Sequence, residues 1–152
     1  MTVSRRMRRL WAGLGTLVRR VRPREAGDYL GRGLDRHLKG DLAGAVADYR
    51  EAVARSRDHH SRAMACLTLG NALEDGGDLA GAVEAYSQAI AHDPGHAGAY
   101  LSRGLVYKAL GDRERAVDDL EIVDELTHDP QWRQQAAEAL ETLRREEQTA
   151  CD

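Results

Sequence analysis

The chain contains no phenylalanine and few residues that interrupt helices. Among its 152 residues there are 3 Pro and 2 Cys, whereas Ala and Leu recur throughout. Ala and Leu favour helices, and the β-branched residues that favour strands are sparse. With 42% hydrophobic and 31% charged residues, the composition is that of a folded chain rather than a disordered one. We therefore expect an all-α protein.

Long apolar runs and a cysteine framework are also missing. No stretch of 18 apolar residues is present, so no transmembrane helix is expected. The short segment LWAGLGTLV is followed at once by RRVR without a small-residue cleavage site, which argues against a secretory signal. Cys66 lies in a helical pattern and Cys151 in the tail, so we expect no structural disulfide and a reducing, cytoplasmic location.

Signatures of catalysis and metal binding are absent as well. The six His are scattered and form no H-E-x-x-H motif, and the two Cys lack zinc-ligand spacing. The glycine-containing stretch that begins at Gly13 lacks the Lys-Ser/Thr of a phosphate-binding loop. Asp118 and Asp119 are neighbours on a helix rather than a convergent pair. The sequence predicts neither an enzyme nor a cofactor.

Acidic residues are absent from residues 1–24, which hold eight Arg and carry a charge of +8. The remaining 128 residues hold 14 basic and 25 acidic side chains, a charge of −11. On a helical wheel, the apolar residues of this segment fall within an arc of about 120°. We call residues 1–24 the basic arm and expect an amphipathic helix that ends at Pro23. Its candidate docking residues are Arg5, Arg6, Arg8, Arg9, Leu10, Trp11, Leu14, Leu17, Val18, Arg19 and Arg20.

Several docking surfaces compete for the basic arm. A basic amphipathic helix with Trp on its apolar face suits an anionic membrane surface. The arm could instead fold into a groove of its own chain or of a neighbouring copy, which would allow a homo-oligomer. Nucleic acid is the weaker alternative, because the rest of the chain is acidic. An Arg-rich, acid-poor segment also fits organelle targeting.

The remainder of the chain repeats itself. GDLAGAVADY at residues 40–49 returns as GDLAGAVEAY at residues 77–86, with eight of ten positions identical, and GDRERAVDDL follows at residues 111–120. Upstream, Gly33, Gly70 and Gly104 are separated by 37 and 34 residues. A period of 34 residues is typical of tetratricopeptide repeats, which are helix–turn–helix units.

The chain resembles this family in all three units. The middle unit matches the family pattern at Leu69, Gly70, Gly77, Asp78, Ala82, Tyr86, Ala89 and Pro94. The third unit departs at Arg103 and Val123, and the first has Arg57 in place of the closing Pro. The resemblance implies a right-handed α-α superhelix over residues 25–147. Its expected parts are repeats at 26–59, 63–96 and 97–130, a capping helix at 130–147 and a tail at 148–152.

Elementary stereochemistry explains the repeated residue types. A glycine can adopt the left-handed conformation that ends a helix, which predicts turns at Gly40, Gly77 and Gly111. Aspartate is a favoured N-cap, which predicts helix starts after Asp41, Asp78 and Asp112. The small residues Gly33, Gly70, Gly104, Ala45, Ala82 and Ala116 should let paired helices approach closely. The large residues Tyr49, Tyr86 and Leu120 should fill gaps between successive hairpins.

Two further features follow from local sequence. The three extra residues of the first interval lie in residues 56–64, where no Pro occurs, so we expect one additional helical turn. Near the C-terminus, Asp129 and Pro130 are typical of a helix start. The apolar stripe of that helix should dock on the third unit; it comprises Trp132, Ala136, Leu140 and Leu143.

The resemblance also implies a binding surface. In this family the first helices of the repeats line a concave groove that binds a peptide or helix of a partner protein. The corresponding residues are Leu30, Leu34, His37, Leu38, Met64, Leu67, Asn71, Glu74, Leu101, Ser102, Leu105 and Lys108. Relatives that grip a chaperone's acidic C-terminus use several Lys, Arg and Asn there, whereas here Asn71 alone fits and Lys108 lies nearby.

We therefore expect a largely apolar groove for a partner helix or peptide. Two alternatives stay open: a peripheral membrane adaptor anchored by the basic arm, and a self-associating structural unit. Single Leu residues could also simply pack between helices, and Asn71 could hydrogen-bond the backbone.

Overall fold

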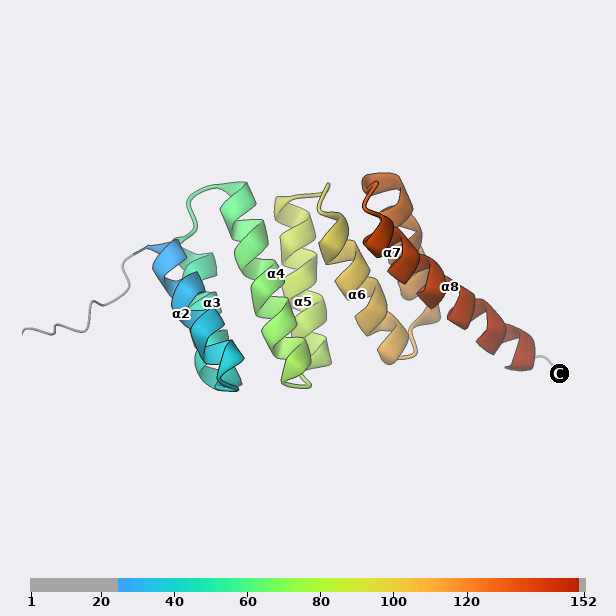
Figure 1. Cartoon of the computed structure of the whole chain (residues 1–152), viewed down its shortest axis with the longest axis horizontal. Helices are drawn as coiled ribbons and strands as arrows, with labels where there is room; N and C mark the ends of the chain where they lie inside the picture. The colour runs from blue at the N-terminus through green and yellow to red at the C-terminus, as the bar shows by residue number, and fades with distance from the viewer. Residues whose placement is uncertain (1–24, 151–152) are drawn as a thin grey trace, which may run out of the picture.

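The computed structural model describes residues 25–150, and within them every regular element is an α-helix. The elements are α2 (Ala26–Leu38), α3 (Leu42–Arg55), α4 (His59–Asp75), α5 (Leu79–His92), α6 (Ala97–Ala109), α7 (Arg113–Leu126) and α8 (Pro130–Ala150). They form three successive antiparallel hairpins, α2–α3, α4–α5 and α6–α7, followed by α8 (Figure 1). The all-α prediction is confirmed, whereas the basic arm lies outside the described residues.

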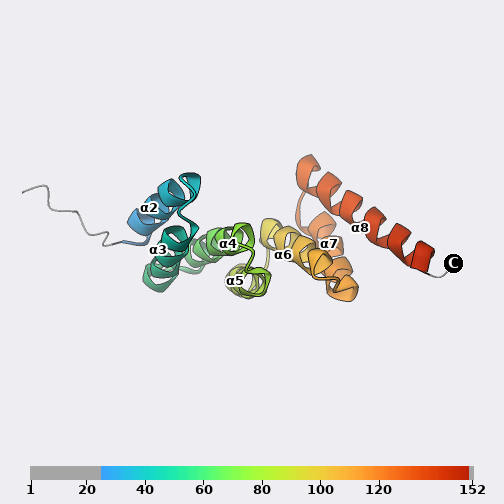
Figure 2. The ribbon, with the colours of Figure 1, turned by 90° about the horizontal axis from the view of Figure 1, so that it is seen from below.

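The hairpins stack along one axis (Figure 1). In the view of Figure 2, α2 and α8 lie at the two ends of the array, on the same side of α4 and α6. No helix among the described residues is both long enough and apolar enough to cross a membrane.

The three hairpin turns have the same structure. Their glycines adopt φ of +80°, +80° and +76°, and in each turn the following carboxylate accepts a hydrogen bond from the backbone N–H three residues on, at 2.9, 2.9 and 3.2 Å. The predictions for glycines and N-caps are both confirmed; they concern Gly40, Gly77, Gly111, Asp41, Asp78 and Asp112.

The extra turn predicted between the first two units lies at the start of α4. This helix has 17 residues, against 13 in α2 and in α6. Asp58 caps it, because its carboxylate accepts hydrogen bonds from the Ser61 N–H at 2.8 Å and the Ser61 hydroxyl at 2.7 Å. The added residues are therefore helical, as expected.

In each hairpin, a large side chain of the second helix packs against a glycine of the first helix. A Cβ on Gly70 would lie 2.4 Å from the Tyr86 ring, and one on Gly33 would lie 2.6 Å from the Tyr49 ring. The large side chains thus fill space inside their own hairpin as well as between hairpins. The tyrosines share one core cluster with Val106 of the third hairpin.

Two hairpins contain an ion pair between an arginine and a buried aspartate that sequence reasoning missed. The Arg103 guanidinium donates to both oxygens of Asp119, at 2.7 and 2.8 Å, and Asp119 is 4% exposed. Arg32 pairs with the buried Asp48 in the same way in the first hairpin. The middle hairpin has an apolar pair, Leu69 and Ala85, at these positions.

Charged side chains on α2 form the N-terminal end of the array. The α4 face that packs toward the first hairpin is apolar and buried; it comprises Ala65, Leu69, Ala72 and Leu73. At the equivalent positions, 37 residues earlier, α2 carries Asp28, Arg32, Asp35 and Arg36. A charged face cannot bury against a further hairpin without a large desolvation cost. The first hairpin therefore ends the stack.

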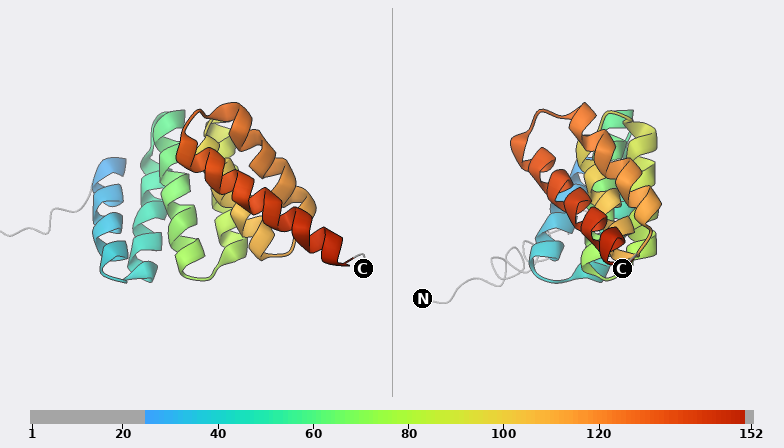
Figure 3. Two further views of the ribbon diagram at one scale, coloured as in Figure 1. Left: turned by 45° about the vertical axis from the view of Figure 1, so that its right-hand side comes forward. Right: turned by 90° about the vertical axis from the view of Figure 1, so that its right-hand side faces the viewer.

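The C-terminal end is closed by α8, which crosses the third hairpin obliquely (Figure 3). The Asp129 carboxylate accepts a hydrogen bond from the Gln131 N–H at 2.8 Å. Ala136 and Leu143 are buried in one cluster with Leu120 and its neighbours. The predicted docking is thus confirmed, although Ala139 also joins the cluster and Trp132 stays 36% exposed. The helix runs to Ala150, three residues past its expected end.

Candidate protein-binding surface

The residues predicted for the groove lie on successive first helices. Within α2, α4 and α6 most of them recur at intervals of three or four residues, which is the spacing of residues on one face of a helix. The helices also contact one another through this face: the His37 Nε2 lies 2.7 Å from an Asp75 carboxylate oxygen. We call the exposed residues of these three helix faces the first-helix surface.

The apolar part of the first-helix surface is concentrated on α2. Leu38 is 80% exposed and Leu34 is 54% exposed, the two largest values among the large hydrophobic side chains of the described residues. Met64 on α4 adds another exposed side chain at 38%. Leu30 and Leu67 are half-buried, with part of each side chain packed on the core. An exposed apolar stripe of this kind is typical of an interaction site.

Leu101 was predicted to face the groove, and this prediction is wrong. Its side chain is 5% exposed and belongs to the core cluster that contains Ala136, Ala139 and Leu143 of α8. The capping helix covers this part of α6, so Leu101 cannot contact a partner. Ser102, Leu105 and Lys108 remain partly exposed on the same helix.

A polar cluster occupies the middle of the surface. The Tyr86 hydroxyl rises from α5 and lies 2.7 Å from the Glu74 carboxylate and 2.9 Å from the Asn71 side-chain oxygen. Burial, followed by the hydrogen bond to Glu74, raises the pKa of Tyr86 above its ordinary value. Ser102 of α6 opposes part of the shift in the pKa of this hydroxyl. The Asn71 side chain was expected to bind a partner or the backbone. In the structure its oxygen instead accepts a hydrogen bond from the Tyr86 hydroxyl.

Cations are scarce on this surface. The imidazole of His37 contacts Asp75, and the guanidinium of Arg103 is held by Asp119 and by the Ser87 hydroxyl at 2.9 Å. Lys108 is the remaining cation among the predicted residues. An acidic peptide would meet one ammonium group beside the carboxylates of Glu74 and Asp75, an arrangement that does not favour it.

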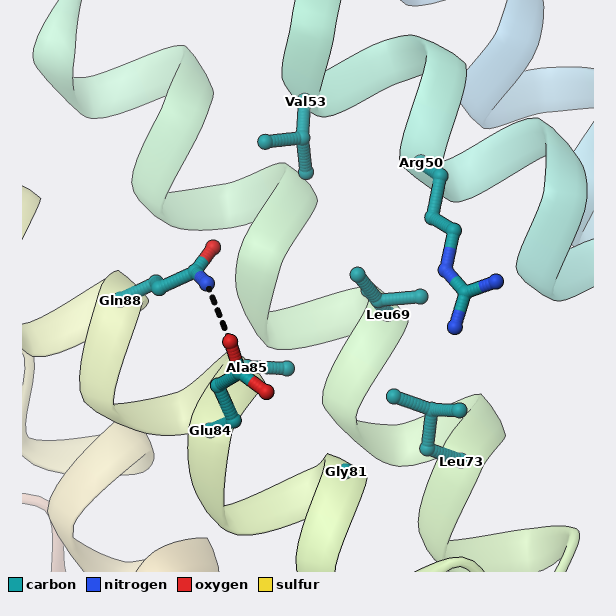
Figure 4. A pocket seen from close by; sticks show the side chains of 8 residues that line it. All are labelled: Arg50, Val53, Leu69, Leu73, Gly81, Glu84, Ala85 and Gln88. Atoms are coloured by element: carbon teal, nitrogen blue, oxygen red, sulfur yellow. Dashed lines mark hydrogen bonds between the residues drawn. The ribbon is translucent and has the colours of Figure 1, made fainter.

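A hollow lies between α3, α4 and α5, away from the predicted residues (Figure 4). It measures about 240 Å³, and its lining residues are Arg50, Val53, Leu69, Leu73, Gly81, Glu84, Ala85 and Gln88. Leu69 and Ala85, which line it, occupy the positions that Arg103 and Asp119 hold in the third hairpin. Pockets for small molecules usually measure about 300–1,000 Å³, so this hollow is small for such a ligand. Among residues 25–149, no cluster of His, Cys, Asp and Glu could hold a metal ion.

Comparison with known proteins identifies the repeat. Residues 70–111 match a family model described as TPR repeat, and residues 97–126 match one described as tetratricopeptide repeat. No curated protein sequence matches the chain.

Solved structures with the same fold are numerous. The first TPR of Spaghetti (RPAP3), bound to the HSP90 peptide SRMEEVD, is 20% identical with a TM-score of 0.72, over 84% of this chain and 94% of that one. The Arabidopsis OM64 TPR domain is 21% identical with a TM-score of 0.70, over 80% and 95%. The Yersinia enterocolitica secretion chaperone SycD, in complex with a YopD peptide, is 16% identical with a TM-score of 0.71, over 80% and 93%.

At such identities the likeness to solved structures establishes the fold, and the matched repeats establish the kind of hairpin. The first hairpin has the same turn and the same glycine–tyrosine contact as the second. Residues 70–126 therefore match tetratricopeptide repeats, and residues 25–150 have the fold of three such repeats followed by a C-terminal capping helix.

Proposed function

We propose that this protein is a protein–protein interaction module whose first-helix surface binds a peptide or helix of a partner, with no chemical step. One observation carries the proposal: Leu34, Leu38 and Met64 stay exposed on this surface. Leaving apolar area in water costs roughly 25 cal/mol per Å². Because both ends of the array are already closed, these side chains do not serve to stack another repeat.

Structural neighbours support the proposal. The Spaghetti repeat domain is bound to an HSP90 peptide and SycD to a YopD peptide, so this fold can hold peptides. The charge of the surface differs from that of a clamp for acidic tails, since it combines Lys108 with the carboxylates of Glu74 and Asp75. The partner segment that fits it has large apolar side chains flanked by basic ones.

A selection from a random 16-residue peptide library, displayed on phage and run on the full chain, tests this function. We expect the selected peptides to be rich in Leu, Trp, Arg and Lys. Their affinity should fall at least about tenfold, or 1.4 kcal/mol, in the Leu34→Glu variant. Leu110→Glu is the matched control, because Leu110 is 51% exposed and lies at the α6–α7 turn. Peptides that bind both variants equally well would contradict the proposal.

A peripheral membrane adaptor is the second candidate, carried by the +8 charge and the Trp-containing apolar arc of the basic arm. Both functions suit the cytoplasm. Co-sedimentation of the full chain with anionic and neutral vesicles tests it, with Trp11→Glu and Leu14→Glu as the variant. Pelleting only with anionic vesicles, and only by the wild type, is the expected result for an adaptor. A self-associating unit would show a molecular mass that rises with concentration.

A further inference from the structure

We propose that the basic arm of this same chain, residues 1–24, occupies the first-helix surface when no partner is bound. The chain would then regulate access to its own binding surface. The inference rests on the proposed function, because it names a competitor for the same surface.

The site of contact is the apolar stripe on α2. Leu30, Leu34 and Leu38 follow one another at intervals of four residues, so they form a single line along the helix. The two most exposed of them carry most of the uncovered apolar area. The adjacent α2 face carries Arg32 and Arg36, both engaged with Asp48, so the leucine stripe is the apolar face of α2 that an apolar segment would contact.

Chain connectivity favours this occupant. The arm ends at Arg24 and α2 begins at Ala26, so the arm is held next to the stripe without a long linker. A helix over residues 5–22 would extend about 27 Å, against about 20 Å for the 13 residues of α2. The arm is thus long enough to run back along α2 as far as Leu38.

The chemistry of the arm matches that of the surface. Its apolar arc supplies Leu10, Trp11 and Leu14, whereas its charge of +8 opposes the −11 of the remaining residues. Glu74 and Asp75 on the neighbouring helix provide carboxylates beside the stripe. Because arm and surface belong to one chain, their effective concentration is in the millimolar range. A partner segment must compete with it.

Fluorescence of Trp11 in the full chain tests the contact. The protein has 2 Trp, so Trp132→Phe leaves Trp11 as the only indole. We expect its emission to lie at shorter wavelength in the native state than in urea, and its quenching by acrylamide to be slow. Adding Leu34→Glu and Leu38→Glu should shift the emission to longer wavelength and speed the quenching. Adding Leu110→Glu should change neither, and circular dichroism confirms that each variant is folded.

Three results would overturn the inference. The first is a Trp11 emission wavelength that is the same in native protein and in urea, or that does not change with the substitutions on α2. The second is a shift that disappears on dilution, since it would place the arm on a second copy. The third is a shift that appears only when anionic vesicles are added.

The same variants separate this inference from the proposed function. Suppose that phage-selected peptides still bind through Leu34, but that Trp11 fluorescence does not change on Leu34→Glu substitution. The proposed function would then stand, and only the docking of the arm would be wrong. In the Trp11→Glu, Leu14→Glu variant the arm is displaced and the surface is free. If no selected peptide binds this variant, the proposed function is wrong. If both proposals hold, this variant binds the selected peptides more tightly than wild type.

Discussion

At the scale of single residues, the contact between Gly70 and Tyr86 determines how closely α4 and α5 approach. A methyl group on Gly70 would lie 2.4 Å from a ring that is fully buried and has no space to move into. We expect Gly70→Ala to lower the free energy of unfolding by about 1–3 kcal/mol, as overpacking does. Urea denaturation measures the change.

Gly31→Ala is the matched control. Gly31 lies inside α2, and nothing lies within 4 Å of the position its Cβ would take. Removing the conformational freedom of this glycine should stabilise the protein by about 0.5–1 kcal/mol. Equal destabilisation by both substitutions would show that the crowding at Tyr86 is not the cause.

The buried pair of Arg103 and Asp119 gives a second prediction. Asp119→Ala leaves a guanidinium that is mostly enclosed without its carboxylate, and the free energy of unfolding should fall by about 3 kcal/mol. Adding Arg103→Leu recreates the Leu69–Ala85 pair of the middle hairpin and should recover most of that loss. A double-mutant cycle in urea measures the coupling. Losses that simply add would contradict a direct pair.

This pair also shows why part of the interior was not predicted. The glycines were found because all three units repeat them. The ion pairs recur 16 residues apart in the first and third units only, whereas the middle unit, which best resembles the family, has Leu69 and Ala85. A comparison of the outer units with each other would have revealed them.

At the scale of elements, the N-caps make stability depend on pH. Hydrogen bonds from the Arg115 side chain, and then from its backbone, lower the pKa of Asp112. A carboxylate with a lowered folded-state pKa stabilises the fold above its unfolded pKa of about 3.9, and this contribution is lost as the pH falls further. Asp112→Asn keeps a capping side chain that does not titrate. We expect this variant to lose less stability than wild type between neutral pH and pH 3.

Urea denaturation at several pH values checks this prediction. Gln88→Glu provides a control for an added exposed carboxylate that caps no helix. Identical pH profiles for the wild type and the Asp112→Asn chain would exclude a contribution from this cap.

The helices themselves were largely predictable, but the surface that α8 covers was not. The Gly-Asp turns, the extra turn of α4 and the start of α8 depend on local stereochemistry, which sequence records directly. Leu101 occupies the same repeat position as Leu30 and Leu67, so the pattern assigns all three to the groove. Its burial depends on the angle at which α8 crosses α6 (Figure 3), which no local rule supplies.

At the scale of the whole molecule, the distribution of charge determines which peptides can bind. We expect the acidic peptide SRMEEVD to bind at least about tenfold more weakly than a basic amphipathic peptide, a difference of 1.4 kcal/mol. Calorimetry on the full chain and on the Trp11→Glu, Leu14→Glu variant measures both. Added salt should lower the affinity of the basic peptide, because screening reduces its attraction to the acidic protein.

Lys108→Ala provides the control for this comparison. If SRMEEVD binds as well as the basic peptide and loses its affinity in the Lys108→Ala variant, then Lys108 and Asn71 suffice as a clamp. In that case the preference inferred from Glu74 and Asp75 is wrong.

The closed ends of the array also restrict how this protein could have grown. A further repeat cannot be added before the charged face of α2 or after α8. The middle hairpin packs apolar residues against the hairpins on both sides, and the segments that begin α3 and α5 are nearly the same in sequence, as GDLAGAVADY and GDLAGAVEAY show. Tandem duplication of residues 59–95 would therefore insert a hairpin that its neighbours already fit. A longer groove, natural or engineered, is accessible from the inside of this gene and not from its ends.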